Sequence, residues 1–408
     1  MFTRRRFVGL GTAGITFVSL GGAVHDLFAR AAAESAKTEQ NDRVLVVVEL
    51  AGGNDGLNTL IPFEDARYYR NRRTLGVPKA DVLKLSEQVG LHPKMPAMAE
   101  LFKSGRLALI QGVGYPQPDR SHFRSMEIWH TASVDKTPPT SGWLGKYLDA
   151  AQPAKTPRSL GGLALTGTLP QAFQAERTIV PVVSQIDVFQ NNDEGAVAEG
   201  KLRRKLSTSS TAGRSPTSFI RNQAETLYQS IDRLKEAASK YKSTVQYPEG
   251  SLGDQLRRAA QIIAGDLGVR VLFASQDGYD THADQGNAHG ELLGTLSQAL
   301  AAFEKDLTAL CFADRVVVMA FSEFGRRVDE NASRGTDHGA ASCMFLTGSK
   351  IKGGLVGQYP SLERLGEGDL IFNTDFRSVY ATLLDRWLGC PMEKVLGQAF
   401  PTLDLVRA

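Results

Sequence analysis

Two pairs of residues in the sequence combine a carboxylate with an imidazole at a spacing that can serve one metal ion. Asp280 and His282 are two residues apart, so both can face one centre, and Asp337 is followed directly by His338. Carboxylates and imidazoles without thiolates suit Zn, Mn or Mg. The pattern therefore predicts a divalent metal site, and the alternative reading is a polar surface loop.

Two further carboxylates, Asp55 and Glu323, follow other apolar runs of the chain. Uncompensated carboxylates that come together repel one another by roughly 4 kcal/mol per pair at about 4 Å and an effective dielectric of about 20. If Asp55 and Glu323 converge with the other acidic groups, a cation is expected among them.

Ser121 is the candidate nucleophile, and His122 beside it is a second candidate catalytic residue. Phe123, Met126 and Trp129 recur at helical spacing, which places Ser121 at or near the N-cap of a helix. A cap needs only the serine oxygen, whereas a nucleophile also needs a base or a metal nearby. Guanidiniums that could clamp an anionic group bidentately are available at Arg120, Arg124, Arg326 and Arg327.

These residues follow short apolar runs that are typical of buried parallel strands. The runs are Val44–Leu50, Leu107–Gly114, residues 269–274 and the run that starts at Val316. Ligands of open α/β sheets bind outside the carboxyl ends of the strands. Asp55, Ser121, Asp280 and Glu323 all come after such an end, so one shared site is expected.

Helical patterns, such as those at 288–310 and 375–388, alternate with the apolar runs. This alternation predicts an α/β fold, a three-layer α/β/α sandwich with a mostly parallel central sheet. Residues 42–408 are expected to form a single domain. Within it, the polar stretch and helical pattern at about 187–250 indicate a mobile loop and helical cap-like insert.

The N-terminal stretch Thr3-Arg4-Arg5-Arg6-Phe7-Val8 has the twin-arginine form and precedes a weakly apolar, Gly-rich run. Residues 1–33 are therefore expected to be a twin-arginine signal peptide, with the translocase as a partner and a periplasmic or secreted product. Without these residues, 43 basic and 43 acidic residues remain, so nothing indicates nucleic-acid binding. No stable membrane span is expected in the mature chain.

Five ordered motifs make the sequence resemble the bacterial domain-of-unknown-function 1501 family. They are the twin-arginine start, VVVELAGGNDGLNTLIP, SHFRSMEIWHT, GYDTHADQ and FSEFGRRVDENASRGTDHG. That family is similar to the alkaline phosphatase and sulfatase superfamily, whose members bind two divalent metals beside a Ser, Thr or modified Cys nucleophile. The resemblance implies an alkaline-phosphatase-like fold with one or two ions of Zn, Mn, Mg or Ca.

Residue by residue, the resemblance implies Ser121 as the nucleophile and a set of metal ligands at Asp55, Asp280, His282, Glu323, Asp337 and His338. The sequence departs from the superfamily at one position. Phe324 stands where an imidazole ligand of the second metal is expected, which favours a single metal or an altered second site.

The function that these residues predict is an exported, metal-dependent hydrolase acting on small phosphate or sulfate esters. Ser121 would attack the ester, and His122, Arg124 and Arg326 would complete the catalytic set. The alternative is a non-catalytic envelope protein of the same fold that binds a ligand or partner, which Phe324 favours. A metal-dependent mutase is a third interpretation.

Overall fold

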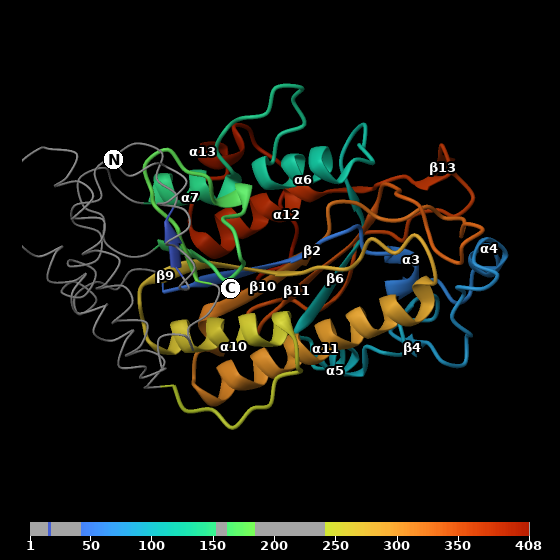
Figure 1. Ribbon diagram of the computed structural model, residues 1–408, viewed down its shortest axis with the longest axis horizontal. Helices are drawn as coiled ribbons and strands as arrows, with labels where there is room; N and C mark the ends of the chain where they lie inside the picture. Colours follow the sequence, from blue (N-terminus) through green and yellow to red (C-terminus); the bar gives the residue numbers. More distant parts are fainter. Residues whose placement is uncertain (1–14, 18–41, 152–160, 184–240, 408) are drawn as a thin grey trace, which may run out of the picture.

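The computed structural model describes residues 15–17, 42–151, 161–183 and 241–407 (Figure 1). The predicted signal peptide, apart from residues 15–17, lies outside the described residues, as does most of the predicted insert at 187–250. No helix within the described ranges is both long and apolar enough to cross a membrane.

A ten-stranded sheet forms the centre of the molecule, in the order β1-β8-β7-β9-β2-β10-β11-β6-β12, with β15 also paired to β6. In that order the strands are β1 (Ile15–Phe17), β8 (Pro181–Val183), β7 (Gly161–Ala164), β9 (Val269–Gln276), β2 (Val44–Leu50), β10 (Val316–Phe321), β11 (Ser342–Thr347), β6 (Leu107–Gly114), β12 (Gly354–Val356) and β15 (Thr374–Asp375). All pairs are parallel except those of β11 with its two neighbours and that of β1 with β8.

Helices cover both faces of the sheet (Figure 1). On one face lie α5 (Pro96–Lys103), α10 (Ser251–Ala264) and α11 (Gln285–Ala309). On the other lie α6 (His122–Thr131), α7 (Trp143–Ala151), α13 (Glu393–Leu396) and α12 (Phe376–Thr382), which continues as a π-helical turn, Leu383–Leu388. The predicted three-layer α/β/α sandwich with a mostly parallel sheet is confirmed.

The β2 strand shows why the sheet is buried on both sides. Val44, Val46 and Val48 pack in the core beneath α5, α10 and α11, whereas Leu45 and Val47 pack in the core beneath α6, α7 and α12. Because successive side chains of a strand point to opposite faces, a continuous apolar run is what a doubly covered strand requires.

Short elements extend the loops at the edges of the sheet. They are α3 (Gly56–Thr59), α4 (Ala66–Asn71), the 3₁₀ turns Gln171–Phe173 and Ala313–Arg315, a small sheet of β3 (Leu60–Ile61), β5 (Gly90–Leu91) and β4 (Leu83–Lys84), and the hairpin of β13 (Leu365–Gly366) and β14 (Asp369–Leu370).

The direction of β11 determines where its preceding loop lies. Since β11 runs antiparallel to β10 and β6, its first residue, Ser342, is level with Val113 near the carboxyl end of β6. The loop before β11 is also the loop that follows β10, and its far end therefore returns to the edge where the loops after β2, β6 and β9 lie. Four loops can meet there.

Candidate functional site

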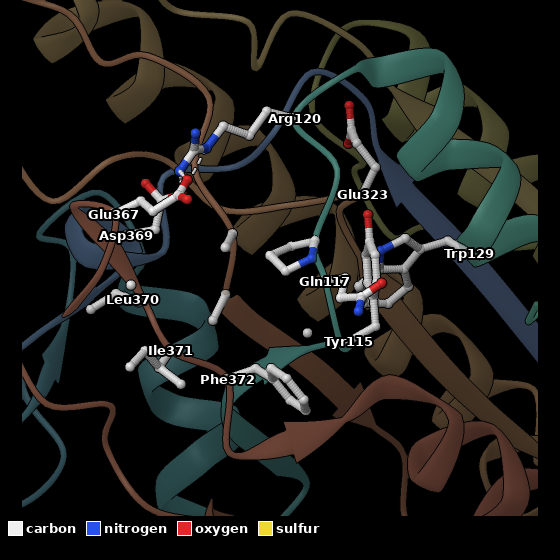
Figure 2. Close-up of a pocket in the computed structure, with 15 residues that line it drawn as sticks. Tyr115, Gln117, Arg120, Trp129, Glu323, Glu367, Asp369, Leu370, Ile371 and Phe372 are labelled. Atoms are coloured by element: carbon white, nitrogen blue, oxygen red, sulfur yellow. Dashed lines mark hydrogen bonds and ion pairs between the residues drawn. The ribbon is translucent and has the colours of Figure 1, made fainter. Parts of the chain in front are cut away.

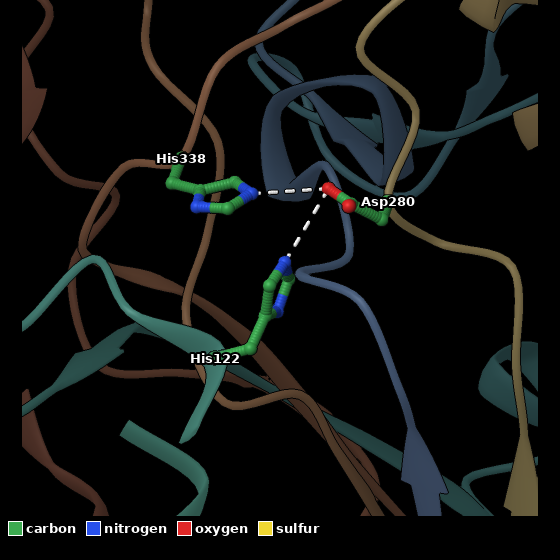
Figure 3. Close-up of side chains that lie close together, drawn as sticks. All are labelled: His122, Asp280 and His338. Atoms are coloured by element: carbon green, nitrogen blue, oxygen red, sulfur yellow. Dashed lines mark hydrogen bonds and ion pairs between the residues drawn. The ribbon is translucent and has the colours of Figure 1, made fainter. Parts of the chain in front are cut away.

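His122, Asp280 and His338 come together at this edge (Figure 3). His122 is the first residue of α6, Asp280 lies in the loop after β9, and His338 lies in the loop before β11. One ligand atom from each residue lies within 4.8 Å of the others. Asp280 Oδ1 is 3.0 Å from His338 Nε2 and 3.4 Å from His122 Nε2. We call these three residues the metal-type cluster.

His282 joins the cluster from the exposed side. Its Nε2 lies 2.9 Å from Asp280 Oδ1 and 2.9 Å from His338 Nε2. Three imidazole Nε2 atoms are thus directed at one carboxylate oxygen. Asp280 itself is about half exposed, at 48% of its side-chain surface, so the cluster can be reached from solvent.

In each of the three rings the other nitrogen, Nδ1, faces an acceptor. The partners are Glu323 Oε1 at 2.8 Å from His122, the Arg120 carbonyl oxygen at 2.8 Å from His338, and Asp337 Oδ1 at 3.2 Å from His282. An acceptor at Nδ1 holds the proton on that nitrogen and leaves the Nε2 lone pair free. Metal-ligating histidines are oriented in this way.

The arrangement fits a divalent cation. The Nε2 atoms of His282 and His338 are only 2.9 Å apart although both Nδ1 atoms face acceptors. Two lone pairs at that distance repel unless a cation or an added proton compensates them. His122 Nε2 is buried and makes no hydrogen bond. A donor set of imidazole nitrogens and one carboxylate is chemistry that Zn and similar ions accept.

The charges around the cluster keep Asp280 ionised. Burial opposes its ionisation, but the hydrogen bond and charge of Arg326, together with the neighbouring imidazoles of His338 and His282, outweigh it and hold the pKa of Asp280 well below its usual range. The hydrogen bond to Glu323, with its negative charge, raises the pKa of His122 against partial burial. The carboxylates of Asp280 and Glu323 thus favour a positive charge on the groups that they contact.

Arg326 binds together the loops that carry the cluster. Its side chain has no exposed surface. Its guanidinium donates to the carbonyl oxygens of Gly53 (2.7 Å), Thr336 (2.8 Å), Tyr279 (2.8 Å) and Gly52, and to Asp280 Oδ1 (2.7 Å). This does not support the predicted role of an anion clamp, because a fully buried guanidinium cannot contact a substrate. Arg326 is a positioning residue.

A glycine makes the close approach of two of these loops possible. Gly52 has φ +118°, and a Cβ there would lie 2.4 Å from the Asp280 backbone nitrogen. Its N–H donates to Glu323 Oε1 at 2.9 Å. Only a residue without a side chain fits this position.

Glu323 and Phe324 form the inner wall of the site. Glu323 is buried and accepts hydrogen bonds from His122, Gly52 and Ser322. Phe324 is also buried, and its ring centroid lies 4.9 Å from those of both His122 and His338. Glu323 and Asp337, which the sequence predicts as metal ligands, face the Nδ1 atoms of His122 and His282, and their role as ligands stays a prediction.

Ser121 occupies the predicted N-cap position of α6 but makes no capping hydrogen bond with its side chain. It is exposed, and its backbone N–H donates to Asp119 Oδ1 at 2.8 Å. Its hydroxyl is thus not committed to the helix. Arg124 lies on the same helix and is held by Glu127 Oε2 (2.6 Å) and by the carbonyl oxygens of Val134 and Asp135.

Asp55 lies apart from the cluster's contacts, in a buried ion pair. Both its oxygens accept hydrogen bonds from Arg72, and Gln285 donates to one of them. Burial would raise the pKa of Asp55, but the Arg72 charge and hydrogen bonds outweigh it and lower the pKa to about 2. Arg72 and Gln285 were not predicted as site residues, and no local pattern in the sequence marks either of them as a partner of Asp55.

Two hollows adjoin the site, and Glu323 lines both. The first is an open groove of about 490 Å³ in front of His122 and Asp280. The second is a cavity of about 370 Å³, walled by Tyr115, Trp129 and Phe372 (Figure 2). Arg120 lies at the rim of the second cavity, where its Nε donates to Asp369 Oδ2 at 2.8 Å.

Comparisons with known proteins give one family and several distant folds. Residues 42–390 match the model of the family described as "Protein of unknown function (DUF1501)". No curated protein matches the sequence.

Three solved structures illustrate the distant similarity. A sulfatase from Pseudoalteromonas sp. is 12% identical, with 92% of this chain and 73% of that chain covered and a TM-score of 0.41. The C-terminal periplasmic domain of EcEptC from Escherichia coli, in complex with Zn, is 11% identical, with coverages of 77% and 75% and a TM-score of 0.37. A protein in the alkaline phosphatase superfamily from Vibrio parahaemolyticus is 11% identical, with coverages of 78% and 64% and a TM-score of 0.33.

The family match spans the strands and loops that build the cluster, from β2 to beyond the π-helical turn at Leu383–Leu388. The matched residues include Gly52, which allows the close approach of the Asp280 loop, and Arg326, which is hydrogen-bonded to several of the loops. They also include the three histidines directed at Asp280. This chain belongs to the DUF1501 family.

Proposed function

We propose that this protein is a metal-dependent hydrolase of phosphate or sulfate esters. The observation that carries the proposal is the convergence of three imidazole Nε2 atoms on Asp280 Oδ1 while each Nδ1 is held by an acceptor. A purely structural role does not require three imidazole Nε2 atoms oriented toward a half-exposed carboxylate. A site that holds a cation and also leaves it open to a ligand does require such oriented nitrogen donors.

The residues that would hold the cation are His122, Asp280 and His338, with His282 as a further donor. When bound, a divalent cation would supply positive charge that lowers the pKa of a nearby hydroxyl and stabilises negative charge on the transferred group. Several imidazole donors favour Zn or a similar transition metal over Mg and Ca, which prefer oxygen ligands.

Ser121 is the proposed nucleophile. Its hydroxyl is exposed, lies next to His122 in the chain and makes no capping hydrogen bond. Its Oγ would form a bond to phosphorus or sulfur while the bond to the ester oxygen breaks, and the departing alcohol would take up a proton. Water would then cleave the serine ester, release phosphate or sulfate and restore the hydroxyl.

The test is to assay the purified chain with p-nitrophenyl phosphate and p-nitrophenyl sulfate, before and after removal of metal with a chelator. Hydrolysis should be lost with the metal and should return with Zn or Mn more fully than with Mg or Ca. Ser121→Ala should abolish hydrolysis but retain bound metal, whereas His338→Ala should lose the metal. A native protein without bound metal and without activity under any of these ions would rule out the proposal.

A second candidate is a non-catalytic protein that uses the same site to bind a ligand. Phe324 favours it, because the ring packs against two of the imidazoles and makes that side of the cluster apolar. The same experiments separate the two functions: a bound metal without turnover of either ester class favours the binder.

We also propose that the protein is exported by the twin-arginine pathway. The motif Thr3-Arg4-Arg5-Arg6-Phe7-Val8 supports this route. Replacing Arg4 and Arg5 by Lys should retain the protein in the cytoplasm of a bacterial host. Equal amounts of the parent and variant chains in the periplasmic fraction would contradict the proposal.

A further inference from the structure

The groove in front of the cluster is lined by an apolar side chain that is exposed and does not pack in the core. Phe123, the second residue of α6, is 91% exposed. Other apolar residues of the same helix, Ile128 and Trp129, are buried. Phe123 lines the groove together with His122 and Asp280, so a molecule that fills the groove in front of the cluster lies beside its ring.

The helix presents a second side chain beside this ring. Met126 lies three residues after Phe123, and residues at that spacing are neighbours on a helix surface. Both residues line the groove together with His122 and Asp280. At Phe123 and Met126 the wall that α6 contributes to the groove is therefore apolar. The Phe123 ring gives it a flat surface, and the Met126 side chain is flexible.

The charges of the groove restrict what can lie against that wall. Carboxylates line it at Glu127, Asp280 and Glu323. Among the described residues that line it, no Lys or Arg side chain occurs. Arg124 and Arg326 are already paired with Glu127 and Asp280. A second anionic substituent, away from the cluster, would therefore find no Lys or Arg among the described lining residues to pair with, which is unfavourable.

We propose that the groove binds the alcohol part of the substrate as an uncharged ring with a flat apolar face, and that Phe123 selects this ring. The inference rests on the proposed function, which puts the anionic group of the ester at the cluster. Phe123 is then a specificity-determining residue. Aromatic pairs of this kind add about tenfold in affinity when the ring is covered.

The experiment compares two anions that cannot be hydrolysed as esters, phenylphosphonate and methylphosphonate, which share the anionic group and differ in the ring. Their affinities for the metal-loaded full chain are measured by calorimetry. Phenylphosphonate should bind about tenfold more tightly than methylphosphonate. Phe123→Ala should remove this preference, and Phe123→Tyr should retain it.

The chain provides a matched control. Ile371 is another exposed apolar residue, at 51%, and it lines the cavity on the other side of Glu323. Ile371→Ala should leave the preference for phenylphosphonate unchanged. Since Phe123 is almost fully exposed, Phe123→Ala does not endanger folding.

The outcomes separate this inference from the proposed function. If both phosphonates bind with equal affinity, or if Phe123→Ala keeps the preference, the inference is wrong while anion binding at the cluster stands. If neither phosphonate binds, both the inference and the proposed function fail.

Discussion

Arg326→Lys tests whether one buried guanidinium holds the candidate site together. Arg326 donates to five acceptors, four carbonyl oxygens and Asp280 Oδ1. A lysine ammonium has only three N–H groups. At least two buried acceptors therefore lose their partner, at about 1–3 kcal/mol each, so the free energy of unfolding should fall by about 2–6 kcal/mol. Domains are stable by about 5–15 kcal/mol in all, so the effect is large.

The assay is denaturant unfolding, together with metal affinity measured by competition with a chelating dye. Arg326→Lys should weaken metal binding as well as stability, because the loops that carry Asp280 and His338 lose their common partner. The matched control is Arg315→Lys on the surface, where Arg315 is paired to Asp266 at 3.3 Å and should change stability by less than about 1 kcal/mol. If Arg326→Lys stays within about 1 kcal/mol of the parent and keeps its metal affinity, the positioning role is refuted.

Three further predictions concern pH, metal content and loop packing. Burial raises the pKa of Glu304 from 4.5 to about 7. As pH rises, the unfolded chain loses the Glu304 proton before the folded chain does, so the free energy of unfolding should fall by about 3 kcal/mol between pH 4.5 and 7. Glu304→Gln should remove this decline, measured by thermal unfolding across the same pH range. If the variant shows the same decline as the parent, other groups cause it. Asp55→Asn leaves Arg72 buried without its counter-charge and should lower the free energy of unfolding by about 3–5 kcal/mol. The metal content per chain should not change. A drop in metal content would place Asp55 among the ligands. Gly52→Ala should lower both stability and metal affinity, because its Cβ would collide with the loop behind the cluster. Gly250→Ala is its control, since Gly250 has φ +108° but no atom within 4 Å of the added Cβ, and equal metal affinities in the two variants would argue against the collision.

Much of the fold was predictable because the strands are buried on both faces. A continuous β-branched run such as VLVVVEL can only be a doubly covered strand or a buried helix, and its length and bounding glycines favour the strand. The strand Leu107–Gly114 also has the predicted bounds, and the strand Val269–Gln276 contains the predicted run at residues 269–274. The direction of Ser342–Thr347 was not predictable, because the side chains of a strand do not encode whether its neighbours run parallel or antiparallel to it.

The candidate site was predictable in part. Asp280, His282 and His338 meet as the spacing indicates. The role of His122 was harder to recognise, because nothing local to the sequence says which of its nitrogens faces Asp280 and which faces Glu323. Glu323 looks like a ligand from its place at a strand end, yet its carboxylate contacts an imidazole, a backbone N–H and a serine hydroxyl. Roles of this kind depend on tertiary distances and not on residue type.

The ion pair of Asp55 explains why one cation is the better expectation than two. Asp55 and Arg72 have no exposed side-chain surface, and the guanidinium already neutralises the carboxylate. A divalent cation bound to Asp55 would lie near Arg72, and a double and a single positive charge at about 4 Å repel by roughly 8 kcal/mol at an effective dielectric of about 20. At Asp280 the balance is different, because the carboxylate is half exposed and three imidazole Nε2 atoms face it. Because the guanidinium of Arg72 already neutralises Asp55, we expect one cation, at Asp280, and none at Asp55.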